Sequence, residues 1–201
     1  MTAILESLVA ALQSEKESIE ESEVHKLAIL SLNFGAFAKS VEALQRILLC
    51  ERSELLSGRA NDDNHMGNAG LSLDKYRHDF IEQQSQIQDA MIEGIGNECT
   101  AILSELDDSE HLCPSNPAQQ PHDCANRVMD YLKSVFERLS FMPRSLIEVC
   151  QFTSCRHIAQ YMQSLLADGE GSINVLGVFN LNLDLLTLES RVEEFDTPDL
   201  G

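Results

Sequence analysis

The sequence contains no Trp, and only 5% of its 201 residues are aromatic. A core with so few rings must rely on Leu, Ile, Val, Ala and Met, the side chains that usually fill the interfaces between packed helices. A chain of this length can bury a stable core without the help of disulfides or metal ions. The shortage of aromatic residues therefore favours an all-α protein.

Basic residues are also scarce, because 14 Lys and Arg stand against 33 Asp and Glu and the formal net charge is −19 at pH 7. Such a charge repels the phosphate backbone of nucleic acids and the anionic headgroups of membranes. We therefore expect no nucleic-acid partner and no direct membrane insertion. Basic surfaces of partner proteins would be attracted instead.

Long apolar runs and targeting signals are missing as well. The longest apolar runs, such as Leu27 to Leu32, fall far short of the roughly 20 residues that span a bilayer. The first residues lack the positive charges and the small-residue cleavage site of a secretory signal. These absences predict a cytoplasmic protein, in which the six Cys are expected to be reduced thiols within helices.

Signatures of catalysis are equally few. The sequence has no Gly-x-Ser-x-Gly elbow, no His-Glu-x-x-His helix and no Gly-Lys-Ser/Thr phosphate loop. The Gly pairs at 94 and 96 and at 169 and 171 do not follow a strand pattern and do not complete a nucleotide motif. We expect no enzyme activity and no cofactor.

One group of residues could in principle bind a metal ion. Two His-x-Cys pairs across a short loop could close a tetrahedral zinc site, formed by His111, Cys113, His122 and Cys124. Their position beside a Pro-rich linker, and a ligand spacing narrower than structural zinc sites use, favour chance co-occurrence. We therefore assign no metal and keep a small zinc-binding protein only as an alternative.

A second group could in principle form a nucleophile pair. Cys150 and His157 lie seven residues apart on a predicted helix and share one face, and Cys155 is close by. A reactive pair needs direct contact and an electropositive setting. Because the neighbours include Phe152 and Met162, we interpret these residues as packing side chains.

What the sequence does contain is helical periodicity. Apolar residues recur at three-and-four spacing along most of the chain, with no convincing period-two segment. Two stretches of turn-forming residues interrupt the pattern, one rich in Gly, Asn and Asp and one rich in Pro. We predict an all-α antiparallel bundle or stack of helical hairpins, with about six helices. The predicted divisions are N-terminal helices at 1–56, a flexible loop at 57–72, a long helix at 73–107 kinked near Gly94 and Gly96, a Pro-rich linker at 108–122, a three-helix region at 123–195 and a tail at 196–201.

The last predicted helix, from about residue 172 to 195, carries the most detailed expectation. Ser172 is a possible N-cap, because its hydroxyl can accept a hydrogen bond from the first turn. One apolar face is expected to be buried, formed by Val175, Leu176, Phe179, Leu183 and Leu186.

Motifs in the C-terminal third of the chain resemble a known family. They are Tyr131-Leu132-Lys133-Ser134-Val135-Phe136, Met142-Pro143, Ser154-Cys155-Arg156-His157-Ile158, Leu165-Leu166-Ala167-Asp168, and Asn182-Leu183-Asp184 with Glu189. Their order and spacing match the family pattern without gaps from Pro143 to Glu189. The chain thus resembles the Sec-fifteen family, a helical-rod subunit of the exocyst vesicle-tethering complex.

This resemblance implies a protein that docks exocytic vesicles at the plasma membrane through contacts with other exocyst subunits and a Rab-type small GTPase. It implies peripheral association with secretory vesicles and the plasma membrane. Asn182, Asp184 and Glu189 are the candidate partner-binding residues, although Asn182 and Asp184 would also suit a polar helix surface with local hydrogen bonds. The alternative function is a generic helical scaffold without an exocyst role.

Overall fold

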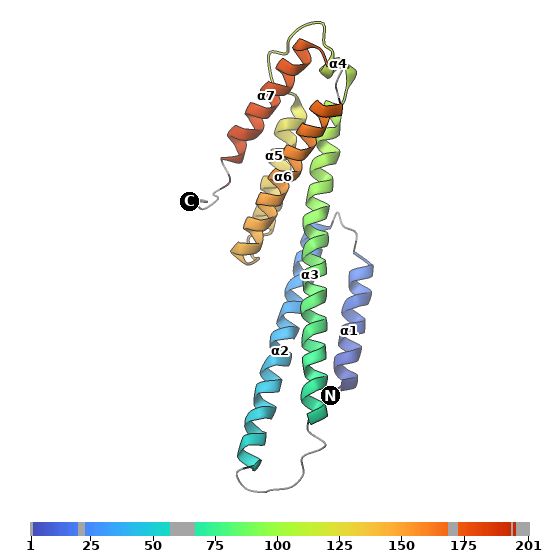
Figure 1. The fold of residues 1–201 in the computed structure, drawn as a ribbon, viewed down its shortest axis with the longest axis vertical. Coiled ribbons are helices and arrows are strands. Elements are labelled where there is room, and N and C mark those ends of the chain that lie inside the picture. Colours follow the sequence, from blue (N-terminus) through green and yellow to red (C-terminus); the bar gives the residue numbers. More distant parts are fainter. Residues whose placement is uncertain (1, 20–22, 57–66, 169–172, 194, 196–201) are drawn as a thin grey trace. The chain divides into compact units, whose positions relative to one another are not determined.

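The computed structural model describes residues 2–19, 23–56, 67–168, 173–193 and 195. Within these ranges it contains seven α-helices, one 3₁₀ turn and no strand (Figure 1). The predicted all-α class is therefore confirmed. The chain divides into two compact units, Met1–Met91 and Ile92–Gly201. This boundary falls inside a long helix, whereas composition alone placed the divisions at the loops.

The first unit contains α1 (Thr2–Glu17), α2 (Val24–Leu56) and the first part of α3 (Gly67–Leu103), which lie side by side in Figure 1. Helices α2 and α3 are antiparallel: Gln45 Nε2 donates to Asp74 Oδ1 (3.0 Å) and Gln88 Nε2 to Ser31 Oγ (3.2 Å). The contact residue number therefore falls from 45 to 31 along α2 while it rises from 74 to 88 along α3. This pair is a helical hairpin of the predicted kind.

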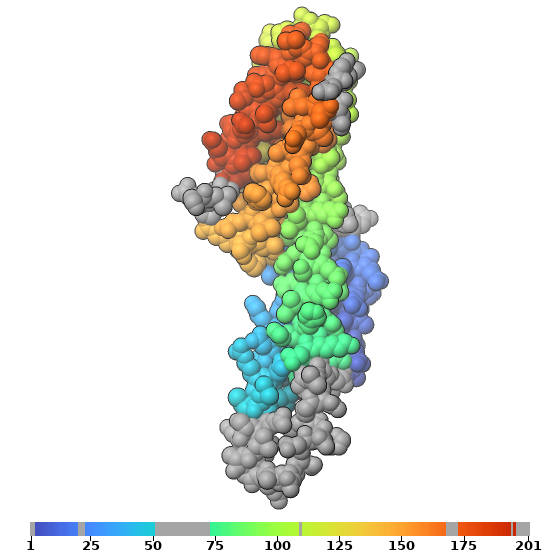
Figure 2. Space-filling view, in the orientation of Figure 1, coloured from blue at the N-terminus to red at the C-terminus, as the bar shows by residue number. Residues whose placement is uncertain are grey.

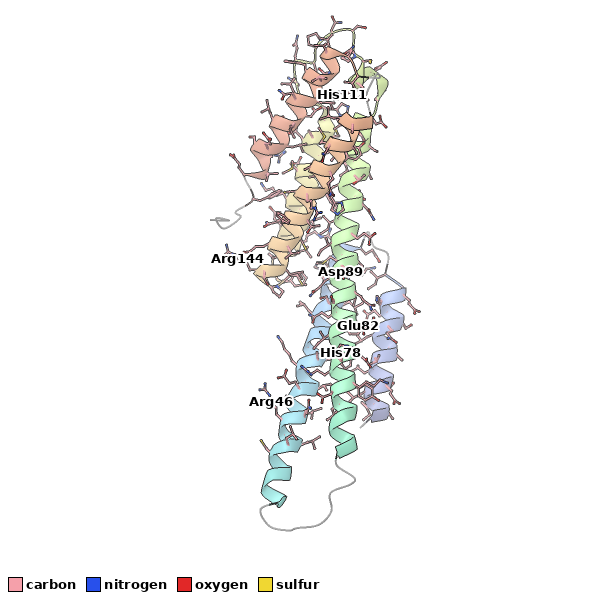
Figure 3. The ribbon with its side chains drawn as sticks, in the orientation of Figure 1. Arg46, His78, Glu82, Asp89, His111 and Arg144 are labelled. Carbon is pink, nitrogen blue, oxygen red and sulfur yellow. The ribbon has the colours of Figure 1, made fainter. Side chains whose placement is uncertain are left out.

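The core of this unit lies between α2 and α3. Phe34 and Phe80 are fully buried, with ring centroids 6.1 Å apart. Helix α1 packs alongside, where the Tyr76 hydroxyl donates to Glu6 Oε1 (2.8 Å) and Lys16 Nζ to Gln83 Oε1 (3.2 Å). In Figure 3, His78, Glu82 and Asp89 are labelled in this order along the part of α3 that belongs to this unit.

Helix α2 is more apolar than a surface helix needs to be. By length and composition alone, Val24–Cys50 could cross a membrane, with a mean hydropathy of 1.3, although 39% of that window is buried inside the protein. The buried share is the core face, where Leu27, Phe34 and Val41 are at most 3% exposed. A buried core helix can have the same length and composition, and α2 also has a second, exposed face.

Helix α3 begins earlier than the sequence suggested. Residues 67–72, predicted as loop, already belong to it, and residues 57–66 lie outside the described part of the chain. The helix continues through Gly94 and Gly96 to Leu103, and a 3₁₀ turn follows at Ser104–Leu106. A Cβ on Gly96 would lie 3.0 Å from Cδ2 of His157, so the glycine makes room for that ring.

The second unit adds α4 (Ser109–Leu112), α5 (Asp123–Arg138), α6 (Arg144–Asp168) and α7 (Val175–Val192) to the end of α3. The three-helix region that was predicted after the Pro-rich linker corresponds to α5, α6 and α7. The linker was predicted without any helix, which is wrong, because α4 fits in the four residues that precede Cys113 and the first proline. Helix α5 buries one face, which includes Val128, Leu132 and Val135.

Candidate partner-binding site

Helix α7 is attached to the Pro-rich linker at its N-terminus by Asn174. The Asn174 side chain caps the helix by accepting a hydrogen bond from the Gly177 N–H (2.8 Å). The Asn174 N–H donates to the carbonyl oxygen of Leu112 (3.1 Å), and its Nδ2 donates to that of Pro114 (3.0 Å). Ser172, the predicted cap, lies outside the described residues.

Two buried polar residues continue this attachment along α7. Asn180 donates through Nδ2 to the His111 carbonyl oxygen (3.3 Å) and accepts from the Ala118 N–H (2.9 Å). Asp184 Oδ1 accepts from the His122 N–H (2.6 Å), and its Oδ2 lies 2.8 Å from His111 Nε2. His111 is labelled in Figure 3. We call Asn174, Asn180 and Asp184 the polar anchor of α7.

The polar anchor explains how a charged side chain can be buried in this unit. Asp184 is 0% exposed, and burying a carboxylate is costly unless its oxygens are hydrogen-bonded. Here both oxygens have partners, at His111 and His122. Asp184 was a candidate partner-binding residue, but this position leaves no part of its side chain at the surface. Of the three candidates, only Asn182 and Glu189 are exposed.

The anchor turns the most apolar face of α7 outward. Five large apolar side chains are exposed there: Val175 (85%), Val178 (51%), Phe179 (47%), Leu185 (38%) and Leu186 (54%). Asn182 and Glu189 fall at the same helical spacing, seven and fourteen residues after Val175. We call these seven residues the outer face of α7, which belongs to the red helix in Figure 2.

The prediction that Val175, Phe179 and Leu186 are buried is therefore wrong. The inward residues are instead Gly177, Asn180, Leu181, Asp184 and Leu188. Helix α7 has apolar residues around much of its circumference, so hydrophobic spacing alone did not identify the inward side. Asn180 and Asp184 share the inward face with Leu181 and Leu188. Because polar residues in a helix usually lie on the solvent side, these two made the inward face look exposed.

The structure uses the zinc candidates in other ways. The rings of His111 and His122 meet edge to face with centroids 5.1 Å apart, and Nδ1 of His122 accepts from the Cys124 N–H (3.3 Å). Cys113 is exposed, whereas burial raises the pKa of the Cys124 thiol to about 12 and so disfavours the thiolate that zinc requires. Across the described ranges, no group of three or more His, Cys, Asp or Glu side chains is placed to hold a metal ion.

Cys150, Cys155 and His157 lie on α6. Burial raises the pKa of Cys150 to about 11 and also raises that of Cys155, which makes both thiols poor nucleophiles at neutral pH. The His157 ring packs against Gly96 of α3. These contacts agree with the interpretation of the three residues as packing side chains.

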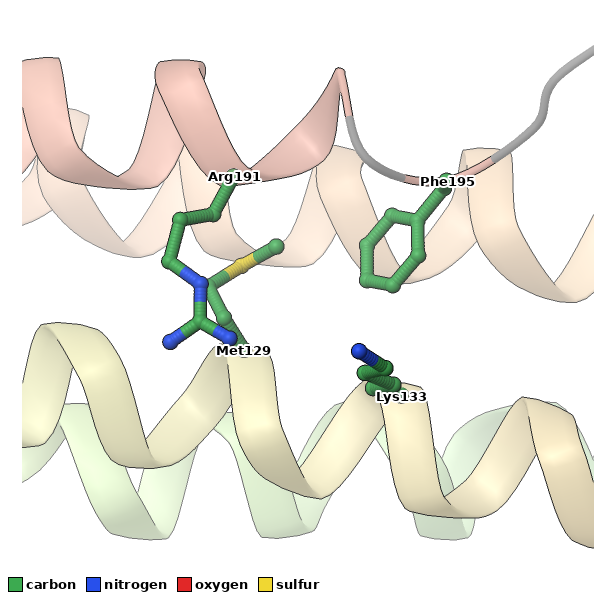
Figure 4. A pocket seen from close by; sticks show the side chains of 4 residues that line it. All are labelled: Met129, Lys133, Arg191 and Phe195. Carbon is green, nitrogen blue, oxygen red and sulfur yellow. The ribbon is translucent and has the colours of Figure 1, made fainter.

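A small cavity lies between α5 and α7, lined by Met129, Lys133, Arg191 and Phe195 (Figure 4). Its volume of about 40 Å³ is far below the roughly 300 Å³ at which sites for small molecules begin. Arg191 already donates to Asp130 Oδ1 (2.7 Å). This cavity is therefore a gap beside an ion pair, and the outer face of α7 is the stronger candidate site.

Comparison with known families agrees with the motifs. The sequence model of the family described as "Exocyst complex subunit Sec15 C-terminal" matches residues 2–200. No curated protein and no solved structure matches the chain. Because the family match covers nearly every residue, including those before the motifs, this chain belongs to the Sec15 C-terminal family of exocyst subunits.

Proposed function

We propose that this chain takes part in tethering exocytic vesicles to the plasma membrane, and that the outer face of α7 binds a Rab-type small GTPase in its active form. Membership of the Sec15 C-terminal family supports a role as an exocyst component with other exocyst subunits as partners. That family is one of structural tethering subunits and not of enzymes. The Rab contact is the finer part of the proposal.

The exposure of the outer face of α7 supports this assignment. A soluble protein rarely leaves five large apolar side chains together on one helix unless a partner covers them. Protein interfaces combine such apolar anchors with a polar rim, which Asn182 and Glu189 supply here. The polar anchor fixes α7 in this orientation before binding, so ordering the helix adds little to the cost of association.

The experiment is a pull-down of this chain with Rab bait locked in the GTP or the GDP state, followed by mass spectrometry of the proteins that are retained. We expect GTP-dependent binding and recovery of exocyst subunits. Leu186→Asp should abolish Rab binding, because the substitution places a charge among the apolar side chains of the outer face. Asn182→Ala should weaken Rab binding.

Leu166→Asp on α6 is the matched control, since Leu166 is 47% exposed and Leu186 is 54% exposed. Both variants should unfold at nearly the wild-type temperature, and only Leu186→Asp should lose the Rab. If both variants bound the Rab equally well, the outer face of α7 would not be the Rab-binding site. If the pull-down recovered neither Rab nor exocyst subunits, the chain would be a helical scaffold of the same family without the proposed tethering function.

The same proposal extends to localisation. A chain with a net charge of −19 is repelled by anionic headgroups, so we propose that it lies in the cytoplasm and reaches vesicles and the plasma membrane through protein partners. A fluorescently tagged Leu186→Asp variant should leave vesicles while the tagged Leu166→Asp control stays on them.

A further inference from the structure

Helix α2 carries a second exposed face, which the exocyst assignment does not explain. Its outward residues, all exposed, are Ile29, Asn33, Ala36, Ser40, Ala43 and Ile47. The two isoleucines are 44% and 54% exposed, and Leu44 beside them is 37% exposed. Their spacing of four and three residues is that of a helix-packing seam. We call these six residues the outer face of α2.

The outer face of α2 has no charged residue, although 23% of the chain is charged. Within residues 24–50, Lys26 lies just before the outer face begins, and Lys39, Glu42 and Arg46 lie to one side of it, where Arg46 donates to Glu42 Oε1 (2.6 Å; Arg46 is labelled in Figure 3). The high hydropathy of α2 thus has two sources, its buried core face and this exposed seam. A seam of this kind is an interface when another helix covers it.

The seam has a similar composition on the two sides of its midpoint, which lies between Ala36 and Ser40. Small residues occupy the middle, and an isoleucine stands at each end. The Ser40 hydroxyl donates to the Ala36 carbonyl oxygen (2.9 Å) within the helix, so Ser40 can pack as a small residue with its polar group satisfied. From either end the seam runs from an isoleucine to small central residues, and it differs only in that Asn33 stands on one side of the midpoint where Ala43 stands on the other.

We propose that the outer face of α2 is a self-association surface, on which two copies of this chain pack α2 against α2 in antiparallel orientation about a two-fold axis. A two-fold interface must be self-complementary, and this seam is. Ile29 of one copy would pack on Ile47 of the other, and Ala36 on Ser40. The small central residues would let the two helices approach closely.

The size of the seam limits the strength of the dimer. It is about 27 Å long, and a helix pair of that length buries on the order of 1,000 Å², the low end for specific interfaces. We therefore expect reversible dimers at micromolar concentrations. The net charge of −19 on each copy opposes association, as does Lys39 near the two-fold axis, so added salt should strengthen the dimer.

Sedimentation equilibrium of the full chain, from low micromolar to sub-millimolar concentration, tests the proposal. The mass should rise from 22.4 kDa towards twice that value, and salt should shift the transition to lower concentration. Ala36→Glu should hold the protein as a monomer. Ala10→Glu, at an exposed alanine of α1, should leave dimerisation intact, and circular dichroism should show that both variants are folded.

A crosslink reports the orientation of the two helices. The antiparallel arrangement brings residue 26 of one copy to Cys50 of the other, so the Lys26→Cys variant should form disulfides between position 26 of one chain and Cys50 of the other under mild oxidation. Within one chain these two positions are about 36 Å apart on the helix and cannot join. Adding Ala36→Glu should abolish the crosslink.

Several outcomes would overturn the proposal. The chain could stay monomeric at every concentration, or Ala36→Glu and Ala10→Glu could weaken the dimer equally. In the Lys26→Cys variant, disulfides that join position 26 of one copy to position 26 of the other would show a parallel pair. A monomer that cosediments with anionic vesicles, and stops doing so in Ala36→Glu, would assign the seam to a lipid surface. None of these results depends on Rab binding by α7.

Discussion

At the scale of single residues, Asp184 shows how much one buried side chain can organise. Its two oxygens hold the ring of His111 and the backbone of His122 from the middle of α7. Asp184→Ala leaves both of these groups buried without a partner. We expect the free energy of unfolding to fall by roughly 2–5 kcal/mol, measured by urea denaturation.

Two further variants define that effect. Asp184→Asn keeps an oxygen for the His122 N–H and should lose less stability than Asp184→Ala. Glu189→Ala, on the exposed side of the same helix, should change the free energy of unfolding by less than about 0.5 kcal/mol. Equal losses for Asp184→Ala and Glu189→Ala would contradict the role of the polar anchor.

The cysteines are expected to differ in reactivity, because some of their thiols are buried and others are exposed. Burial raises the pKa of Cys99 and Cys124 to about 12 and that of Cys150 to about 11, whereas Cys50 and Cys113 are exposed. At pH 8 the buried thiols are almost fully protonated and shielded, so an aromatic disulfide reagent should modify Cys50 and Cys113 first. Cys99, Cys124 and Cys150 should react only on unfolding. Rapid labelling of Cys124 in the folded protein would be inconsistent with this core.

At the scale of elements, Gly177 marks the closest approach of α7 to the linker. A Cβ at this position would lie 1.9 Å from the Leu112 carbonyl oxygen, a backbone atom that cannot turn aside. Replacing an exposed helical glycine by alanine normally stabilises a helix by up to about 1 kcal/mol. We expect Gly177→Ala to do the opposite and to lower the free energy of unfolding by about 2 kcal/mol or more.

Thermal and urea denaturation measure that loss, with Val178→Ala as the control on the exposed side of α7. The control should change stability by less than about 0.5 kcal/mol. A Gly177→Ala protein as stable as the wild type would mean that α7 can move away from the linker without cost.

The elements also show what the sequence could predict. Helix periodicity identified α1, α2, α5, α6 and α7, because apolar residues at three-and-four spacing can be recognised within each segment alone. It did not identify which face of α7 is buried. That choice depends on backbone atoms of the linker, which bind Asn174 and Asn180 and leave no trace in hydrophobic spacing. The early start of α3 was missed because Gly67 and Asn68 usually indicate turns.

The sequence named three residues of the candidate site, and their role in binding stays a prediction. The family motifs led to Asn182 and Glu189, which the structure exposes, and to Asp184, which it buries. The apolar side chains that make up most of the outer face of α7 had been assigned to the core. Exposure of an apolar residue is decided by tertiary packing, so no sequence motif indicated it.

At the scale of the whole molecule, the excess of acidic residues is expected to lower stability. A net charge of −19 makes the folded chain repel itself, and the ion pairs among the described residues are mostly exposed and contribute little. Screening this repulsion should raise the melting temperature as sodium chloride increases from low to physiological concentration.

Circular dichroism at low protein concentration measures this shift and keeps self-association out of the result. Potassium chloride should give the same shift as sodium chloride, because screening depends on ionic strength. A melting temperature that falls with salt would show that attractive pairs, and not repulsion, dominate.

The hydrogen bonds between the Pro-rich linker and α7 determine which linker residues can be substituted. On the linker side, the bonds to α7 come almost entirely from main-chain atoms of five residues, His111, Leu112, Pro114, Ala118 and His122. Main-chain carbonyls are common to every amino acid, and amide hydrogens to all but proline. The exposed positions between these residues, 115–117 and 119–120, can therefore change in evolution without moving the path of the chain. The same positions would accept an epitope or a fluorophore while α7 keeps its orientation.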